Sequence, residues 1–169
     1  MVTAYIGLGS NLAGPLRGKI VTPEQQVKQA LNALADLPET RVLQQSSLYR
    51  SKPLASADAP RQPDYINAVA AIETGLAAEQ LLDGLQTIEA SHQRVRDKKW
   101  GPRTLDADLL LYGNATINTL RLQVPHPGLP ERAFVLYPLA EIAPALEIPG
   151  QGPITRLAAA CPRDGLIVL

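Results

Sequence analysis

The segment from residue 94 to residue 108 combines cationic, aromatic and acidic side chains that together could bind a metal-bound polyphosphate. Asp106 and Asp108 stand two residues apart, at the start of a segment that continues as the apolar run of residues 109–112. Since such a run is typical of a buried strand, both carboxylates should point to the same face of a sheet. At about 7 Å they would repel by roughly 2 kcal/mol, and a divalent cation turns that repulsion into binding. The cations that could take the remaining phosphate oxygens are Arg94, Arg96, Lys98, Lys99 and Arg103.

Each of these features also has an interpretation that needs no ligand. An Asp-x-Asp pair is common on exposed strands, and a run of charges is often a solvated loop. Trp100, the only tryptophan, is followed by a glycine and a proline. Its ring could close over a planar ligand or could pack in the core. The spacing alone leaves these alternatives open.

Three further sets of polar residues are candidates for the same site. Gln86 and Glu89 stand three apart on an expected helix, where they are either an ordinary solvated face or part of the cleft. Tyr65 and Asn67 share one face of an expected strand, where the amide could read an amide-like heterocycle or be structural. His126 stands between two prolines and could be a phosphate ligand, a proton donor or a turn residue. The sequence has no G-x-x-x-x-G-K-[ST] loop, so side chains and metal must hold a nucleotide.

The elements that must position these residues follow the order βαββαβ. Strand-forming runs cover residues 3–8, 41–49, 65–73 and the aspartate-bearing segment from residue 106. A helix is expected after Thr22, which can cap it together with the glutamine three residues later, and the leucine spacing at residues 81–88 predicts a second helix. This order predicts an α+β fold with a ferredoxin-like sheet of mostly antiparallel strands. Helical segments at residues 130–142 and 154–160 would cover the other face, which gives α/β/α layers in a single domain over residues 1–169.

The composition predicts a soluble, cytoplasmic protein. The 169 residues include 16 basic and 16 acidic side chains, so the overall field favours neither nucleic acid nor an anionic membrane as a partner. Cys161 is the only cysteine, which excludes an internal disulfide and is typical of a reducing compartment. The sequence has no apolar run long enough for a membrane span and no signal-peptide pattern at its start.

Four motifs, taken together and in this order, resemble the 6-hydroxymethyl-7,8-dihydropterin pyrophosphokinase (HPPK) family. They are Gly-Ser-Asn-Leu at residues 9–12, Gln-Pro-Asp-Tyr-Ile-Asn-Ala at 62–68, Trp-Gly-Pro-Arg-Thr-Leu-Asp-Ala-Asp at 100–108 and Val-Pro-His at 124–126. The resemblance extends over nearly the whole chain. It implies an enzyme of folate biosynthesis that transfers pyrophosphate from ATP to the pterin hydroxymethyl oxygen and releases AMP.

The resemblance also implies a role for individual residues. Asp106 and Asp108 would hold two magnesium ions, and Asp106 would lie near the substrate hydroxyl. The catalytic group would be Arg94, Arg103, Asp106 and Asp108. The pterin would contact Ser51, Lys52, Pro53, Leu54, Tyr65, Asn67, Trp100, Asp106 and Phe134. ATP, the co-substrate, would contact Gln86, Glu89, Arg96, Arg103, Arg121, His126 and Arg132.

Other functions compete with this interpretation. A non-catalytic ferredoxin-like module would bind nucleotide or metal without turnover, and an ordinary γ-phosphoryl kinase would release ADP in place of AMP. Lys99 stands where the family often has arginine, so a bidentate phosphate contact is reduced to a point charge. A downstream folate-pathway enzyme is a possible partner.

Overall fold

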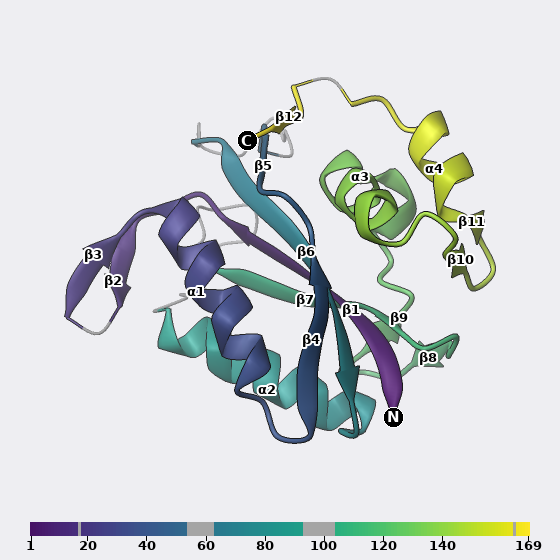
Figure 1. The fold of residues 1–169 in the computed structure, drawn as a ribbon, viewed down its shortest axis with the longest axis horizontal. Coiled ribbons are helices and arrows are strands. Elements are labelled where there is room, and N and C mark those ends of the chain that lie inside the picture. The colour runs from purple at the N-terminus through teal and green to yellow at the C-terminus, as the bar shows by residue number, and fades with distance from the viewer. Residues whose placement is uncertain (17, 54–62, 93–103, 164) are drawn as a thin grey trace.

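The computed structural model describes residues 1–16, 18–53, 63–92, 104–163 and 165–169, and Figure 1 shows their arrangement. The strands are β1 (Val2–Ser10), β2 (Gly14–Leu16), β3 (Lys19–Val21), β4 (Thr40–Gln45), β5 (Tyr49–Ser51), β6 (Tyr65–Thr74), β7 (Asp106–Tyr112), β8 (Ile117–Asn118), β9 (Gln123–Val124), β10 (Glu147–Ile148), β11 (Gly152–Pro153) and β12 (Ile167–Val168). The helices are α1 (Pro23–Ala35), α2 (Ala78–Ser91), α3 (Ala133–Ile142), α4 (Ile154–Ala160) and the short 3-10 helix η1 (Leu129–Glu131).

The main sheet is antiparallel at every described pairing. Its strand order is β12-β5-β6-β1-β7, and β4 also pairs with β6. The two longest strands, β1 and β6, lie side by side at its centre, and β7 pairs with the other edge of β1. The expected mixed α+β class with a mostly antiparallel sheet is therefore confirmed.

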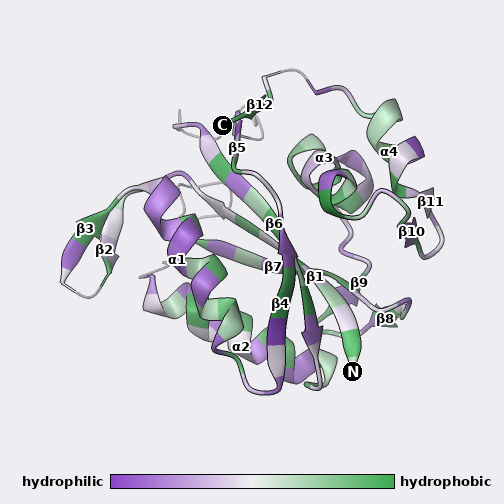
Figure 2. Cartoon of the chain, in the orientation of Figure 1, coloured by the Kyte–Doolittle hydropathy of each residue, from purple (hydrophilic) through white to green (hydrophobic). Residues whose placement is uncertain are grey.

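Helices cover both faces of this sheet. Side chains alternate along β6, so that Ile66, Ala68, Ala70 and Ile72 join a core with α1 and α2, whereas Val69 and Ala71 join a second core with α3 and α4. Figure 1 shows the same division, with α1 and α2 on one side of the sheet and α3 and α4 on the other. In Figure 2 hydrophobic and hydrophilic residues alternate along α1, as expected for a helix with one buried face.

The start of α1 is the one that the sequence predicts. Thr22 Oγ1 accepts a hydrogen bond from the Gln25 N–H at 3.2 Å, and Gln25 Oε1 accepts one from the Thr22 N–H at 2.8 Å. Pro23 occupies the first turn, where no intrahelical N–H is needed. This capping box confirms the predicted helix boundary.

The expected single strand at residues 41–49 was wrong, because the chain leaves the sheet between β4 and β5. Ser46 stays tied to β6, since its N–H donates to the Val69 carbonyl at 2.8 Å. The Glu141 carboxylate on α3 accepts hydrogen bonds from the N–H and the hydroxyl of Ser47, both at 3.0 Å. Ser47 and Glu141 are 94 residues apart in sequence, so no local pattern could predict the break.

The expected helical segment at residues 130–142 is likewise divided. Arg132 has an extended backbone, with φ −109° and ψ 106°, and it separates η1 from α3. Two further features were not among the predicted elements: the hairpin of β2 and β3, and the pairing of β12 with β5, where Ile167 lies opposite Arg50.

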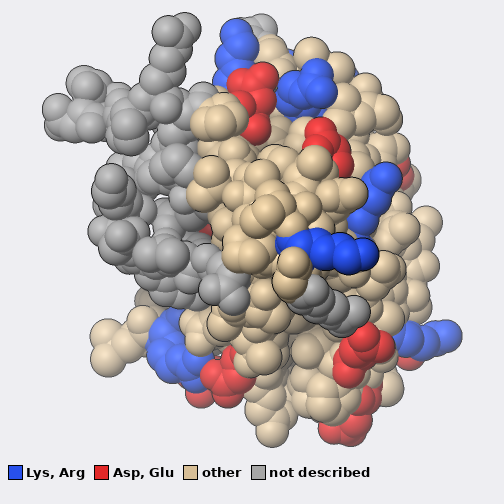
Figure 3. Space-filling view, turned by 90° about the vertical axis from the view of Figure 1, so that its left-hand side faces the viewer, with Lys and Arg blue, Asp and Glu red and all other residues tan. Residues whose placement is uncertain are grey.

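Charges are distributed evenly over the face drawn in Figure 3. Among the residues coloured there, basic and acidic side chains are interspersed, without a large area of one sign. This agrees with the balanced count of charged residues in the sequence. In the described part of the chain, every helix is too short or too polar to span a bilayer.

Candidate functional site

Strand register aligns two candidate residues and a glycine across the sheet, in a line that we call the sheet row. Gly9 on β1 lies opposite Asn67 on β6 and also opposite Asp106 on β7. The sheet row is therefore Asn67, Gly9 and Asp106. Because directly opposed residues point to the same face of a sheet, the Asn67 amide and the Asp106 carboxylate flank a position without a side chain.

Asp108 occupies the next place on the same face. It lies opposite Gly7 on β1, whereas Ala107 between the two aspartates is buried in the core beneath α1 and α2. Both aspartates are partly exposed. The expectation that the two carboxylates share one face is confirmed, and each of them faces a glycine across the strand pair.

The absence of a side chain at Gly9 matters because the neighbouring groups approach closely. A Cβ atom added at Gly9 would lie 3.0 Å from Asn67 Nδ2 and 3.6 Å from Tyr65 Cδ1. Glycine within a strand often marks such a close approach. Gly9 was predicted only as part of a motif and Gly7 was not singled out, although two glycines at a spacing of two in a strand are a recognisable signal in the sequence.

The end of β5 and the residues that follow it border the same face. Ser51 lies opposite Tyr65, and its hydroxyl donates to Asn67 Oδ1 at 2.6 Å. Lys52 and Pro53 follow, and the stem of Lys52 lies against Gly165, within 3.2 Å of an added Cβ there. The structure thus brings together Ser51, Tyr65 and Asn67 from the predicted pterin contacts.

The backbone of β7 makes two hydrogen bonds at its outer edge, one with a side chain and one with another backbone group. The Ala107 N–H donates to Glu89 Oε2 at 2.9 Å, and the His126 N–H donates to the Leu110 carbonyl at 3.0 Å. Glu89 is only 4% exposed, on the side of the sheet that α2 covers. Its carboxylate therefore braces the strand that carries the aspartates, a role that the helical spacing did not predict.

Three predicted ATP contacts, Arg121, His126 and Arg132, lie on the segments that follow β8, and we call them the outer group. His126 Nδ1 accepts a hydrogen bond from the Gly128 N–H at 3.0 Å, so the neutral ring has its proton on Nε2. Burial, and secondarily the charge of Arg132, lower the pKa of His126 to about 4. His126 is therefore neutral near pH 7 and offers an N–H donor.

Arg132 lies between His126 and the predicted pterin contact Phe134. Its guanidinium carbon is 5.8 Å from the centre of the Phe134 ring, a cation–π distance. On the other side it lies against the backbone of Gly128, where an added Cβ would come within 2.5 Å of the guanidinium carbon. The side chains of Arg132, His126 and Phe134 thus form one cluster around η1.

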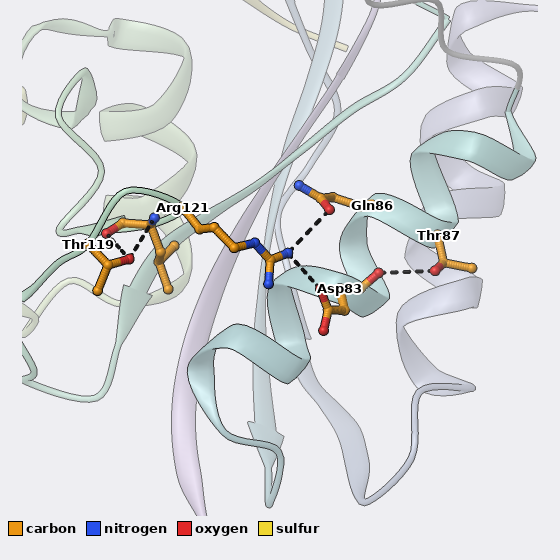
Figure 4. A network of polar contacts seen from close by, with 6 residues as sticks. Asp83, Gln86, Thr87, Thr119 and Arg121 are labelled. Carbon is orange, nitrogen blue, oxygen red and sulfur yellow. Dashed lines mark hydrogen bonds and ion pairs between the residues drawn. The ribbon is translucent and has the colours of Figure 1, made fainter.

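Arg121 is held at the surface by α2, as Figure 4 shows. Its Nη2 donates to Asp83 Oδ1 at 2.6 Å and to Gln86 Oε1 at 3.5 Å. The bond to Asp83 is the main reason why the pKa of Arg121 is raised. Thr119 fixes the turn that contains Arg121, since the Leu122 N–H donates to Thr119 Oγ1 at 3.1 Å. Two predicted ATP contacts, Gln86 and Arg121, are therefore adjacent.

A protein-family model described as 7,8-dihydro-6-hydroxymethylpterin-pyrophosphokinase (HPPK) matches residues 5–144. The chain belongs to the HPPK family. A relative from Pseudomonas aeruginosa, named 2-amino-4-hydroxy-6-hydroxymethyldihydropteridine pyrophosphokinase, is 49% identical over 162 residues, which cover 96% of this chain and 93% of that protein. A relative of the same name from Haemophilus influenzae is 50% identical over 157 residues, covering 93% and 91%.

Solved structures agree with the HPPK fold. A crystal structure described as HPPK-DHPS in complex with substrates matches with a TM-score of 0.68 at 10% identity and covers 95% of this chain. A Plasmodium falciparum HPPK-DHPS structure with pteroate matches with a TM-score of 0.66 at 11% identity and covers 94%. This chain spans only 45% and 42% of those longer chains.

Several HPPK residues predicted from the sequence lie outside the described residues. They are Leu54, Arg94, Arg96, Trp100 and Arg103, and the roles given to them stay predictions. Within the described part of the chain, no group of three or more His, Cys, Asp or Glu side chains is placed to hold a metal ion. Asp106 and Asp108 place two carboxylates on one face of the sheet. Carboxylate oxygens are ligands for hard metal ions.

Proposed function

We propose that this HPPK transfers pyrophosphate from ATP to the hydroxymethyl oxygen of 6-hydroxymethyl-7,8-dihydropterin, giving AMP and the pterin diphosphate in folate biosynthesis. The names of relatives at 49% and 50% identity support this activity. The observation that carries it in the structure is the sheet row, in which Asn67 and Asp106 flank the bare position of Gly9. A flat heterocycle with polar edges could lie over such a position, with an amide at one side and a carboxylate at the other.

Asp106 and Asp108 are the residues that we propose as magnesium ligands, for two ions. Carboxylate oxygens suit this hard cation, and neither aspartate faces a side chain across β1. Bound magnesium would neutralise phosphate charge and help align the triphosphate. Asp106 itself lies at the end of the sheet row and would orient the substrate hydroxyl for in-line attack on the β-phosphorus. Glu89 keeps both carboxylates in place through the Ala107 N–H.

The remaining described residues divide between the two substrates. We assign the pterin to Tyr65, Asn67, Phe134 and residues 51–53, with Leu54 and Trp100 added from the sequence. We assign ATP to the outer group with Gln86 and Glu89, and Arg96 and Arg103 are added in the same way. Neutral His126 would donate from Nε2 to a phosphate oxygen, whereas Arg121 and Arg132 supply positive charge. Arg94 and Arg103 complete the proposed catalytic group.

The strand order supports a finer description of the fold. With β1, β4, β6 and β7 taken as the four strands of the βαββαβ unit, their order and antiparallel pairing are those expected of a ferredoxin-like sheet in a single domain. The partners in this proposal are the two small substrates and, downstream, another enzyme of folate synthesis. The structures described as HPPK-DHPS motivate the latter. ATP as co-substrate fits the cytoplasm as the proposed location.

Phosphorus NMR of the purified protein with ATP, magnesium and 6-hydroxymethyl-7,8-dihydropterin tests the proposal. Formation of AMP and a pterin diphosphate is the expected result. Formation of ADP and a pterin monophosphate would contradict the proposal and show that the protein is a γ-phosphoryl kinase. Tight ATP binding without any reaction would replace it with a non-catalytic binding module.

A further inference from the structure

The Asn67 amide is held in one orientation from the β5 side. Ser51 and Asn67 are diagonal neighbours, because Tyr49 lies opposite Asn67 and Ser51 lies opposite Tyr65. The Ser51 hydroxyl donates to Asn67 Oδ1 at 2.6 Å, and the two residues are only 6% and 4% exposed. An amide oxygen can only accept, so the hydroxyl must be the donor in this pair. A buried hydrogen bond of this kind fixes which end of the amide faces β5.

The nitrogen of the same amide points the other way, over β1. Nδ2 would lie 3.0 Å from a Cβ added at Gly9, and Gly9 separates Asn67 from Asp106 in the sheet row. Among the hydrogen bonds of the described residues, Asn67 uses its Oδ1 and not its Nδ2. Within the described part of the chain, both N–H groups of Nδ2 are thus available on the face where the aspartates lie.

We infer that Ser51 is a specificity-determining positioning residue, whose hydroxyl holds Asn67 so that the site presents a hydrogen-bond donor to the heterocycle. The inference rests on the proposed function. A ring edge with a carbonyl oxygen or an unprotonated nitrogen at this point is accepted. A ring edge with an amino group there places two donors face to face and is rejected, because neither buried group can then be satisfied. Without the Ser51 hydroxyl the amide can turn over and accept instead, so the selection is lost.

The test compares 6-hydroxymethyl-7,8-dihydropterin with its 4-amino analogue, in which the ring carbonyl is replaced by an amino group. Affinity of each is measured by calorimetry with magnesium and a non-hydrolysable ATP analogue, and kcat/KM is measured with ATP. The proteins are the unmodified chain, Ser51→Ala and Ser51→Thr. Ser47→Ala is the matched control, because the Ser47 hydroxyl donates to Glu141 at 3.0 Å, away from the sheet row.

We expect the unmodified chain, Ser51→Thr and Ser47→Ala to prefer the carbonyl compound equally. Ser51→Ala should lose about tenfold of that preference, the value of one well-placed hydrogen bond, while ATP affinity stays unchanged. A preference in Ser51→Ala equal to that of the unmodified chain overturns the inference and leaves the proposed function intact. An unmodified chain that neither binds nor converts the pterin overturns both.

A second variant covers the case in which Ser51→Ala does not fold. Gly9→Ala places a methyl group 3.0 Å from Asn67 Nδ2 and so presses on the amide from the side opposite Ser51. It should reduce the same preference while the Ser51 hydroxyl is still present. An unchanged preference in Gly9→Ala shows that the orientation of Asn67 does not select the substrate, which overturns the inference.

Discussion

The sheet row and the outer group are held in different ways. Asn67, Gly9 and Asp106 take their positions from the register of three paired strands, and Ser51 braces the amide from a fourth. The outer group instead lies on short connecting segments, where the described contacts of each side chain are with a few nearby residues. Arg121 has an exposed carboxylate as its partner, at 62% side-chain exposure.

This difference matches the two kinds of ligand that the proposed site must bind. A rigid heterocycle is distinguished by donors and acceptors at fixed places, which a paired sheet supplies because no strand can move without breaking its ladder. A triphosphate is a flexible chain of equivalent oxygens, so guanidinium groups that can shift still bind it. Substitutions in the sheet row should therefore have large effects on catalysis or pterin binding. Substitutions in the outer group should have smaller effects on ATP binding, and these effects should depend on salt.

The largest effect should follow from Asp108→Ala, next to the sheet row. Loss of a metal ligand should lower kcat by about a hundredfold or more. Asp108 is partly exposed, so the fold should be kept. AMP release and thermal unfolding measure the two effects. Glu73→Gln, which removes a partly exposed carboxylate bound to Arg41 at 3.1 Å, is the control and should remain fully active. A nearly normal rate in Asp108→Ala would contradict the metal assignment.

Much of the fold, including part of the sheet row, could be predicted from the sequence, because local patterns determine it. The strand at residues 65–73, the cap at Thr22 and the bounds of α4 all agree with the structure. The shared face of Asp106 and Asp108 follows from strand geometry alone.

Contacts between distant segments could not be predicted in the same way. The Ser51 hydroxyl reaches Asn67 only because β5 pairs with β6 in one particular register. The break at Ser47 depends on Glu141, and the brace on Ala107 depends on Glu89 from another element. The helical spacing identifies Glu89 as a polar residue of a helix, but it does not predict that the side chain is buried. Its burial follows from how α2 packs against β7.

A moderate effect is expected from Gly128→Ala in the outer group. Gly128 has a φ of −84°, which alanine adopts without strain, so the fold should be kept. The new methyl group would lie within 2.5 Å of the guanidinium carbon of Arg132 and must displace it. We expect KM for ATP to rise about tenfold, with KM for the pterin less affected.

The double variant Gly128→Ala/Arg132→Ala separates this collision from other effects. If the methyl group acts only through Arg132, the double variant should match Arg132→Ala alone. A further loss in the double variant would mean that η1 itself is disturbed. The outer group would then be as rigid as the sheet row.

The pH dependence of stability should reveal how closely His126 is packed. Its pKa is about 4 in the folded chain, because of burial and Arg132, and near 6.5 in an unfolded one. Between these values the unfolded chain binds more protons, so stability is constant above about pH 6.5 and is lost as the pH falls toward 4. His126→Asn keeps an acceptor for the Gly128 N–H and should lose less stability between pH 7.5 and pH 5 in urea unfolding. Equal losses would show that His126 is solvated.

The smallest effect is expected from Asp83→Asn, which tests how loosely Arg121 is held. Asp83 competes with phosphate oxygens for the Arg121 guanidinium, and both side chains are exposed, at 62% and 45%. An exposed pair of this kind is weak and screened by salt, so the variant should lower KM for ATP by only about twofold at low ionic strength. The difference should vanish in high salt, and KM for the pterin should not change. Glu73→Gln again removes a carboxylate that does not contact Arg121, so it should leave KM for ATP as it was. A change in KM for ATP that persists in high salt, or a change in KM for the pterin, would contradict this. It would mean that the outer group is held as firmly as the sheet row.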